Sequence, residues 1–146
     1  MKSPLLLGTF LSNISDATYA TISNKAAISI NQDPLGEQGV LRKSGGWVPN
    51  SNKPTNPAFG FQIWSGALSK GRVAVVLANL DNSSQQLTLT NSEMPPGLGA
   101  PDAKWDIVEA FSGKTIEGVA LPQSASVGLH DVAVWTMAPA AGEAGF

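Results

Sequence analysis

Two carboxylates lie close together in the segment NQDPLGEQ, which covers residues 31–38. Paired carboxylates can act as a nucleophile and a general acid or base, so Asp33 and Glu37 are the first candidates for catalysis. Asp33, however, precedes Pro34 in a turn sequence, where an aspartate side chain commonly accepts hydrogen bonds from nearby backbone amides. The pattern therefore favours a structural role for Asp33 over a catalytic one.

The adjacent residues His130 and Asp131 are a second candidate, because histidine and aspartate are two members of a catalytic triad. They lie in an apolar run, residues 125–137, that we expect to be one strand, so their side chains point to opposite faces. No serine nucleophile motif accompanies them, and we expect a hydrogen-bonded structural histidine. The chain has no other histidine and no cysteine, so we expect neither a metal nor a cofactor.

Exposed aromatic side chains could instead bind carbohydrate by stacking on sugar rings. Trp47 lies in a long polar loop, residues 44–57, and is the best candidate for such a contact. Trp64 and Trp135 lie within strand patterns and are expected in the core or at an interface. The cations of this half of the chain are scattered, and we expect them on the solvated surface: Arg42, Lys43, Lys70 and Arg72.

Composition excludes several classes of protein. A net charge of −2 with 14% charged residues argues against a nucleic-acid-binding protein, which would carry a basic stripe. No apolar run approaches the roughly 18 residues needed to span a bilayer, so we expect no membrane contact. The first residues imitate a signal peptide, but Pro4 and Gly8 interrupt a short apolar stretch, and we expect no signal peptide in this chain.

The hydrophobic period changes along the chain. Residues 4–11 form an apolar run typical of a buried parallel strand, and Ser15 is a candidate N-cap for a helix that continues to Asn31. From Val40 onward the period is two, and turn residues recur about every ten positions. The expected strands lie at residues 59–66, 71–84, 85–90, 104–113, 114–121 and 125–137. This pattern predicts a mainly β protein with an antiparallel β-sandwich of the Greek-key type.

The first 38 residues form a single strand–helix unit, which cannot bury its apolar faces alone and therefore needs a partner structure. The sequences MKSPLLLGTFLSNIS and SNKAAISINQDPLGEQG supply the explanation. They resemble the segment that closes the (β/α)8 barrel in the α-galactosidases of glycoside hydrolase family 27. The later stretches FQIWSGALSKGRVAVVLANLDN and WDIVEAFSGK are similar in pattern to the C-terminal sandwich of that family.

The resemblance implies three parts: the last strand–helix unit of a barrel (residues 1–38), a sandwich (39–138) and a flexible tail (139–146). It implies a parent enzyme that is secreted and hydrolyses terminal α-linked galactose of oligosaccharides with retention, using two carboxylates from barrel strands upstream of Met1. No catalytic residue is then expected in this chain, which would close and brace the barrel. Because barrel sites lie at the C-terminal ends of strands, Gly8, Thr9 and Phe10 are candidates for the substrate rim.

Two alternatives remain open. One is a stand-alone sandwich that binds carbohydrate through Trp47. The other is an interaction protein that docks on a full-length relative, or on the missing barrel portion, by supplying the strand that it lacks.

Overall fold

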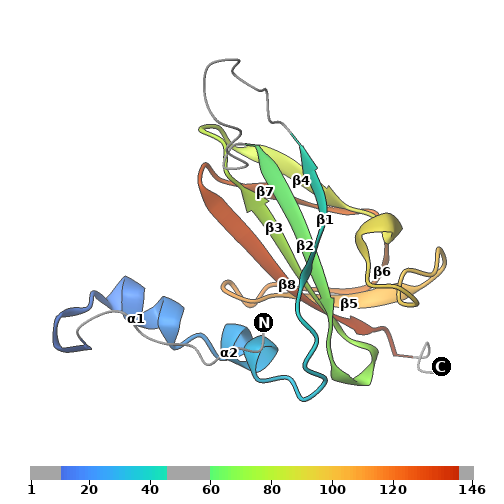
Figure 1. The fold of residues 1–146 in the computed structure, drawn as a ribbon, viewed down its shortest axis with the longest axis horizontal. Coiled ribbons are helices and arrows are strands. Elements are labelled where there is room, and N and C mark those ends of the chain that lie inside the picture. The colour runs from blue at the N-terminus through green and yellow to red at the C-terminus, as the bar shows by residue number, and fades with distance from the viewer. Residues whose placement is uncertain (1–10, 46–59, 142–146) are drawn as a thin grey trace.

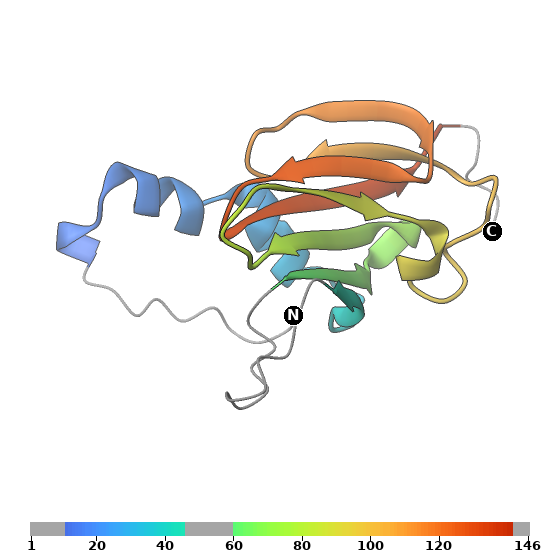
Figure 2. The same ribbon diagram turned by 90° about the horizontal axis from the view of Figure 1, so that it is seen from above.

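The computed structural model describes residues 11–45 and 60–141, and its body is a two-layered β structure (Figures 1 and 2). One layer is a six-stranded antiparallel sheet in the order β1-β2-β3-β8-β5-β6. Its strands are β1 (Val40–Gly45), β2 (Phe61–Ala67), β3 (Val73–Asn79), β8 (Asp131–Pro139), β5 (Lys104–Glu109) and β6 (Thr115–Ala120). The other layer is the antiparallel pair β4 (Gln85–Leu89) and β7 (Gln123–Val127). The predicted antiparallel sandwich is confirmed.

The core lies between the two sheets. It forms because apolar residues recur at every second position of the strands and therefore point to the same face. In β3, Val73, Val75 and Leu77 are fully buried, and they face Met137, Trp135 and Ala133 of β8. The second sheet covers this inner face with Leu87, Leu89 and Val127, which belong to the same core cluster. Burying side chains of this size stabilises the fold by about 1.5–3 kcal/mol each.

The sequence from 125 to 137 is not one strand, and this expectation was wrong. β7 ends at Val127, β8 begins at Asp131, and the two strands belong to different sheets. The break falls at His130, whose φ of +48° is in the left-handed region, which few residues other than glycine adopt. His130 and Asp131 therefore do not alternate across a strand.

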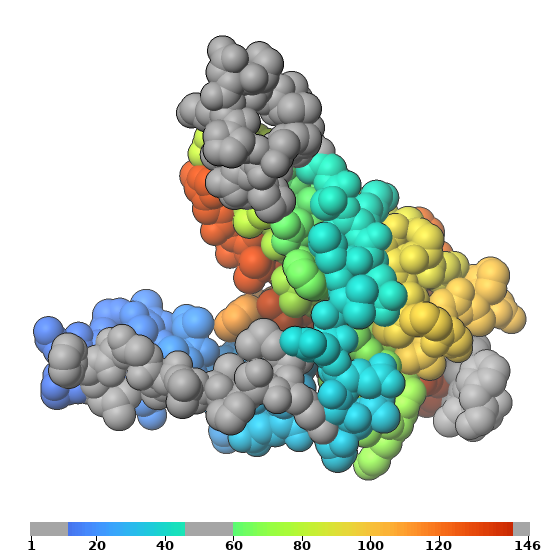
Figure 3. Space-filling model, in the orientation of Figure 1, coloured from blue at the N-terminus to red at the C-terminus, as the bar shows by residue number. Residues whose placement is uncertain are grey.

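The expected helix from Ser15 to Asn31 is two short helices, α1 (Asp16–Ile22) and α2 (Lys25–Asn31), preceded by a 3-10 turn, η1 (Leu11–Asn13). Ser15 caps α1 as predicted, because its side chain accepts a hydrogen bond from the Thr18 amide at 3.1 Å. Neither helix contains a buried residue, and α1 projects away from the sandwich (Figure 3). The predicted barrel strand and the division into residues 1–38, 39–138 and 139–146 remain predictions.

Two 3-10 turns complete the described elements: η2 (Ser69–Gly71) joins β2 to β3, and η3 (Asn91–Glu93) follows β4. Within the described residues, no helix is long and apolar enough to cross a membrane. In the same part of the chain, no group of three or more histidine, cysteine, aspartate or glutamate residues could hold a metal ion.

Candidate functional site

Asp33 fastens the end of α2 to the sandwich. Its Oδ1 accepts hydrogen bonds from the backbone amides of Leu35 at 3.0 Å and Ser69 at 2.8 Å. Its Oδ2 accepts from the Ser69 hydroxyl at 2.8 Å and from Arg72 at 2.7 Å. The bond from Leu35 is the local turn contact expected for Asp33. The bonds from η2 and Arg72 tie this turn to the loop between β2 and β3.

Asn24 fastens the start of α2. Its Oδ1 accepts from the Ala27 amide at 2.9 Å, which caps the helix, and its Nδ2 donates to the carbonyl oxygen of Ala110 at 2.9 Å. Ala110 lies in the turn between β5 and β6, 86 positions further along the chain. The segment from Asn24 to Gly36, called the joint below, is therefore attached to the sandwich at both ends of its helix.

The joint crosses the outer face of the six-stranded sheet, the face turned away from β4 and β7. A Cβ atom added to Gly66 of β2 would lie 3.1 Å from the Cα atom of Gly39, so the chain leaving the joint passes directly over β2. A hollow of about 450 Å³ lies beside it, lined by Ile30 of α2 together with Trp64 and Val76.

The rest of the outer face is mostly apolar, with Gln62 and Thr136 as polar residues among the apolar ones. Trp64, Val76 and Val134 are neighbours across β2, β3 and β8, and the indole of Trp64 is 36% exposed. Alternating strand residues place further apolar side chains on the same face: Ala74, Ala78, Val132 and Val108. Strands that are apolar on both faces are typical of sheets covered on both sides. The outer face thus has the composition that is typical of a covered face.

Comparison with known proteins identifies the sandwich. The sequence profile described as "Alpha galactosidase C-terminal beta sandwich domain" matches residues 58–137. The chain belongs to this family.

The similarity to other members of the melibiase C-terminal family extends into the joint. The probable alpha-galactosidase B of Penicillium simplicissimum is 39% identical over 137 residues, which is 92% of this chain and 30% of that protein. Alpha-galactosidase I from Mortierella vinacea has the same fold, with a TM-score of 0.75 at 23% identity over 95% of this chain and 32% of its own. The α-galactosidase from Saccharomyces cerevisiae solved with raffinose gives 0.74 at 22% identity, over 94% and 40%. The chain therefore spans about a third of the length of these relatives.

Within the described residues of this melibiase-family chain, every carboxyl group with a shifted pKa is held as an anion. Burial by itself raises the pKa of Asp33, but the bonds from Ser69 and Leu35 and the Arg72 charge outweigh it, so this pKa lies below its ordinary value. The same balance lowers the pKa of Glu93, where burial is outweighed by bonds from Thr90 and Ser92.

Glu109 is the third such anion, at the end of β5. Burial raises its pKa, but hydrogen bonds from Ser112, Val134 and Phe111 outweigh this effect and bring the pKa below its ordinary value. Its two oxygens accept from the Phe111 amide at 3.1 Å, the Ser112 amide at 2.6 Å and the Val134 amide at 3.4 Å.

These three carboxyl groups predict loss of stability in acid. Their pKa values are lower in the folded than in the unfolded chain, so they contribute stability above the unfolded value of about 4, and lose it as pH falls through the folded values. The thermal midpoint of the 146-residue chain should be nearly constant from about pH 7 to pH 5 and fall below about pH 4. The Asp33→Asn variant should fall less steeply there; an equally steep fall would contradict the role given to this carboxylate.

Several of the residues that the sequence suggested as contacts lie outside the joint. Gly8, Thr9, Phe10 and Trp47 are outside the described residues, so their proposed sugar contacts stay predictions. The His130 ring is hydrogen-bonded to Asn82 at 2.9 Å, which agrees with a structural histidine.

Trp135 is buried, which agrees with the expected core position. Trp64 lies on the outer face with its indole nitrogen donating to Gln62, and the interface expected for it stays a prediction. The expectation that Arg72 is only solvated surface was wrong, because it forms an ion pair with Asp33 at 2.7 Å. Arg42 and Lys43 also have partners, in Ser65 and Glu93 respectively. Sequence reasoning missed Asn24 as an anchor; the available signal was its N-cap position before an apolar helix.

Proposed function

We propose that this chain is the C-terminal, non-catalytic part of an enzyme that hydrolyses terminal α-linked galactose with retention. Its role there is to brace the catalytic barrel: the joint closes the barrel, and the outer face of the sheet is the surface against which the barrel rests. Support comes from the relatives, which are named as α-galactosidases, and from the relative that was solved with raffinose.

The apolar outer face is the observation that carries this proposal. Trp64, Val108 and Val132 of this face are exposed in the chain alone, while α1 and α2 bury no residue of their own. Covering this area would remove apolar surface from water at about 25 cal/mol per Å². The chain that leaves the joint passes over the same face, and the joint is preceded by α1, so a domain that contains α1 would adjoin this face (Figure 1).

The three carboxylates with shifted pKa values support a non-catalytic role. A retaining glycosidase needs one carboxyl group with a raised pKa to act as the acid, about 5–5.5 Å from a carboxylate nucleophile. The pKa values of Asp33, Glu93 and Glu109 are shifted in the opposite direction. Each of these groups accepts several hydrogen bonds from its own surroundings, which fixes it as an anion.

Hydrolysis of raffinose tests the proposal. The 146-residue chain alone should release no galactose. A chimera that joins the catalytic portion of the Penicillium simplicissimum relative to this chain should release it. Galactose release by the chain alone would contradict the non-catalytic role, and a folded, soluble chimera without activity would contradict the bracing role.

The same outer face supports docking in trans on a full-length relative. That alternative predicts that the separate chain co-purifies with the intact relative, and failure to co-purify would exclude it. Secretion of the parent enzyme, which the family resemblance implies, stays a prediction that recovery of the protein from culture medium would test.

A further inference from the structure

The sequence contains two tripeptides of the form Asn-x-Ser/Thr, which is the acceptor sequence for N-linked glycans at the surface of secreted proteins. They are Asn13-Ile14-Ser15 and Asn82-Ser83-Ser84. The first lies directly before α1, in the part of the chain that the barrel would adjoin, so its exposure in this chain does not describe the enzyme. The second lies in the turn between β3 and β4, within the sandwich, where its surroundings can be judged.

The turn between β3 and β4 lies at the end of the sandwich opposite to the attachment of the joint. Asp33 binds Ser69 of η2, just before β3, whereas Asn82 follows the end of β3. β3 has seven residues, so its two ends lie about 20 Å apart. The turn also leads from the six-stranded sheet to β4 in the other layer (Figure 1). A glycan on this turn would therefore point away from the surface proposed for the barrel.

The buried side chain of Asn79 fixes the backbone of this turn. Its Nδ2 atom donates to the carbonyl oxygens of Ser83 at 2.8 Å and Gly128 at 2.7 Å. Its Oδ1 atom accepts from the Asp81 amide at 3.0 Å. These bonds tie the turn between β3 and β4 to the connection between β7 and β8. The tip of the turn, with its acceptor tripeptide, is thus held in one place at the surface.

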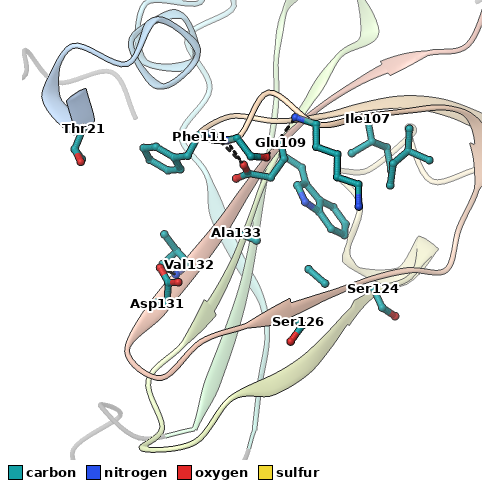
Figure 4. A pocket seen from close by; sticks show the side chains of 14 residues that line it. Thr21, Ile107, Glu109, Phe111, Ser124, Ser126, Asp131, Val132 and Ala133 are labelled. Carbon is teal, nitrogen blue, oxygen red and sulfur yellow. Dashed lines mark hydrogen bonds between the residues drawn. The ribbon is translucent and has the colours of Figure 1, made fainter. Parts of the chain in front are cut away.

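The side-chain amide of Asn82 has its oxygen bonded and its nitrogen available. Nε2 of His130 lies 2.9 Å from Oδ1 of Asn82, and because an amide oxygen only accepts hydrogen bonds, Nε2 carries the proton in this contact. His130 belongs to the connection between β7 and β8, which Figure 4 shows between Ser126 and Asp131. Among the described residues, no hydrogen bond uses Nδ2 of Asn82 or the hydroxyl group of Ser84, and both side chains are exposed. These are the two groups that N-linked glycosylation requires.

We propose that Asn82 carries an N-linked glycan in the parent enzyme. The donor is a lipid-diphosphate-linked oligosaccharide of the secretory pathway, so the proposal rests on the secretion proposed above. Nδ2 of Asn82 forms a bond to the anomeric carbon of the first sugar and gives one proton to a base of the transferase. The bond from that carbon to the diphosphate oxygen breaks, and the lipid diphosphate leaves with the electron pair. Oδ1 takes no part in the new bond, so its contact with His130 is retained.

Peptide mapping of the chimera, produced in yeast behind a secretion leader, tests the proposal. Glycans are removed by a glycan-releasing amidase in heavy-oxygen water, which leaves a labelled aspartate wherever an asparagine was glycosylated. Position 82 should be labelled in most molecules of the secreted chimera. The same chimera produced without the leader should remain unlabelled at this position, because it does not meet the donor.

Substitutions within the tripeptide separate the acceptor sequence from the shape of the turn. Ser84→Ala removes the required hydroxyl group and should abolish the label at Asn82, whereas Ser84→Thr keeps a hydroxyl group and should retain it. Ser83→Ala is the matched control, because Asn79 bonds to the backbone carbonyl of Ser83, which alanine keeps. Its label should equal that of the parent chimera, and thermal midpoints show that each variant is folded.

Two results would overturn the proposal: no label at Asn82 in the secreted chimera, or an equal label in the Ser84→Ala variant. Hydrolysis of raffinose is measured on the same samples, so the two proposals can fail separately. An active chimera without the label would overturn the glycan alone, and a folded, labelled chimera without activity would overturn the bracing role alone. Asn82→Gln should lose the label and keep the activity, since the turn lies away from the surface proposed for the barrel.

Discussion

Replacing Asp33 by alanine is expected to release the joint from the sandwich. The carboxylate is only 4% exposed, and its removal leaves the Ser69 and Leu35 amides and the Arg72 guanidinium without their acceptor. An abandoned buried partner costs about 1–3 kcal/mol, but Arg72 is one-third exposed and can turn to water. We expect the free energy that holds the joint closed to fall by about 2–3 kcal/mol.

The measurement is amide hydrogen exchange, because the joint can open without unfolding of the core. A loss of 2–3 kcal/mol corresponds to exchange about 30- to 140-fold faster in the amides of α2, with little change in β3. Asp102→Ala is the matched control, since Asp102 is an exposed aspartate outside the joint. Unchanged exchange in α2, or equal acceleration in β3, would show that Asp33 does not act as the fastening described here.

Replacing Trp64 by aspartate is expected to inactivate the chimera while leaving the isolated chain nearly intact. In the isolated chain the side chain at position 64 is partly exposed, so a charge there remains solvated. Against a covering barrel the same charge would be buried without a partner, which costs several kcal/mol. We expect raffinose hydrolysis by the chimera to fall at least about tenfold, since each 1.4 kcal/mol is a factor of ten.

The design separates an interface effect from a folding effect. The thermal midpoint of the isolated Trp64→Asp chain should stay close to that of the parent chain, whereas that of the chimera should fall. Leu129→Asp, at an exposed apolar position in the connection between β7 and β8, should leave the activity of the chimera unchanged. Full activity in the Trp64→Asp chimera would show that the barrel does not rest on this face.

The strands could be predicted from the sequence because one local rule generates them. Alternation of apolar and polar residues placed β2, β3, β4 and β5 within a few residues of their observed bounds, and Gly113 marked the turn before β6. The separation of β7 from β8 could not be predicted in this way. The apolar alternation runs almost unbroken through Gly128 to His130, and it is the transfer of the chain to the other sheet that divides it.

Of the contacts that attach the joint to the sandwich, only the local one could be predicted from the sequence. The turn bond of Asp33 depends on residues two positions apart, so local reasoning found it. Its bonds to Ser69 and Arg72, and the bond from Asn24 to Ala110, join positions 36 to 86 apart in the sequence. Which distant partner a polar side chain reaches is set by the packed fold, and no single sequence pattern contains it.

The central claim is that the outer face of the sandwich is covered by the catalytic barrel. Oxidative footprinting of Trp64, read by mass spectrometry, tests this claim directly in the 146-residue chain and in the chimera, with the exposed Leu129 as the internal reference. The account predicts that Trp64 is oxidised readily in the chain and is strongly protected in the chimera, while Leu129 reacts equally in both. Equal oxidation of Trp64 in the two proteins would contradict the account.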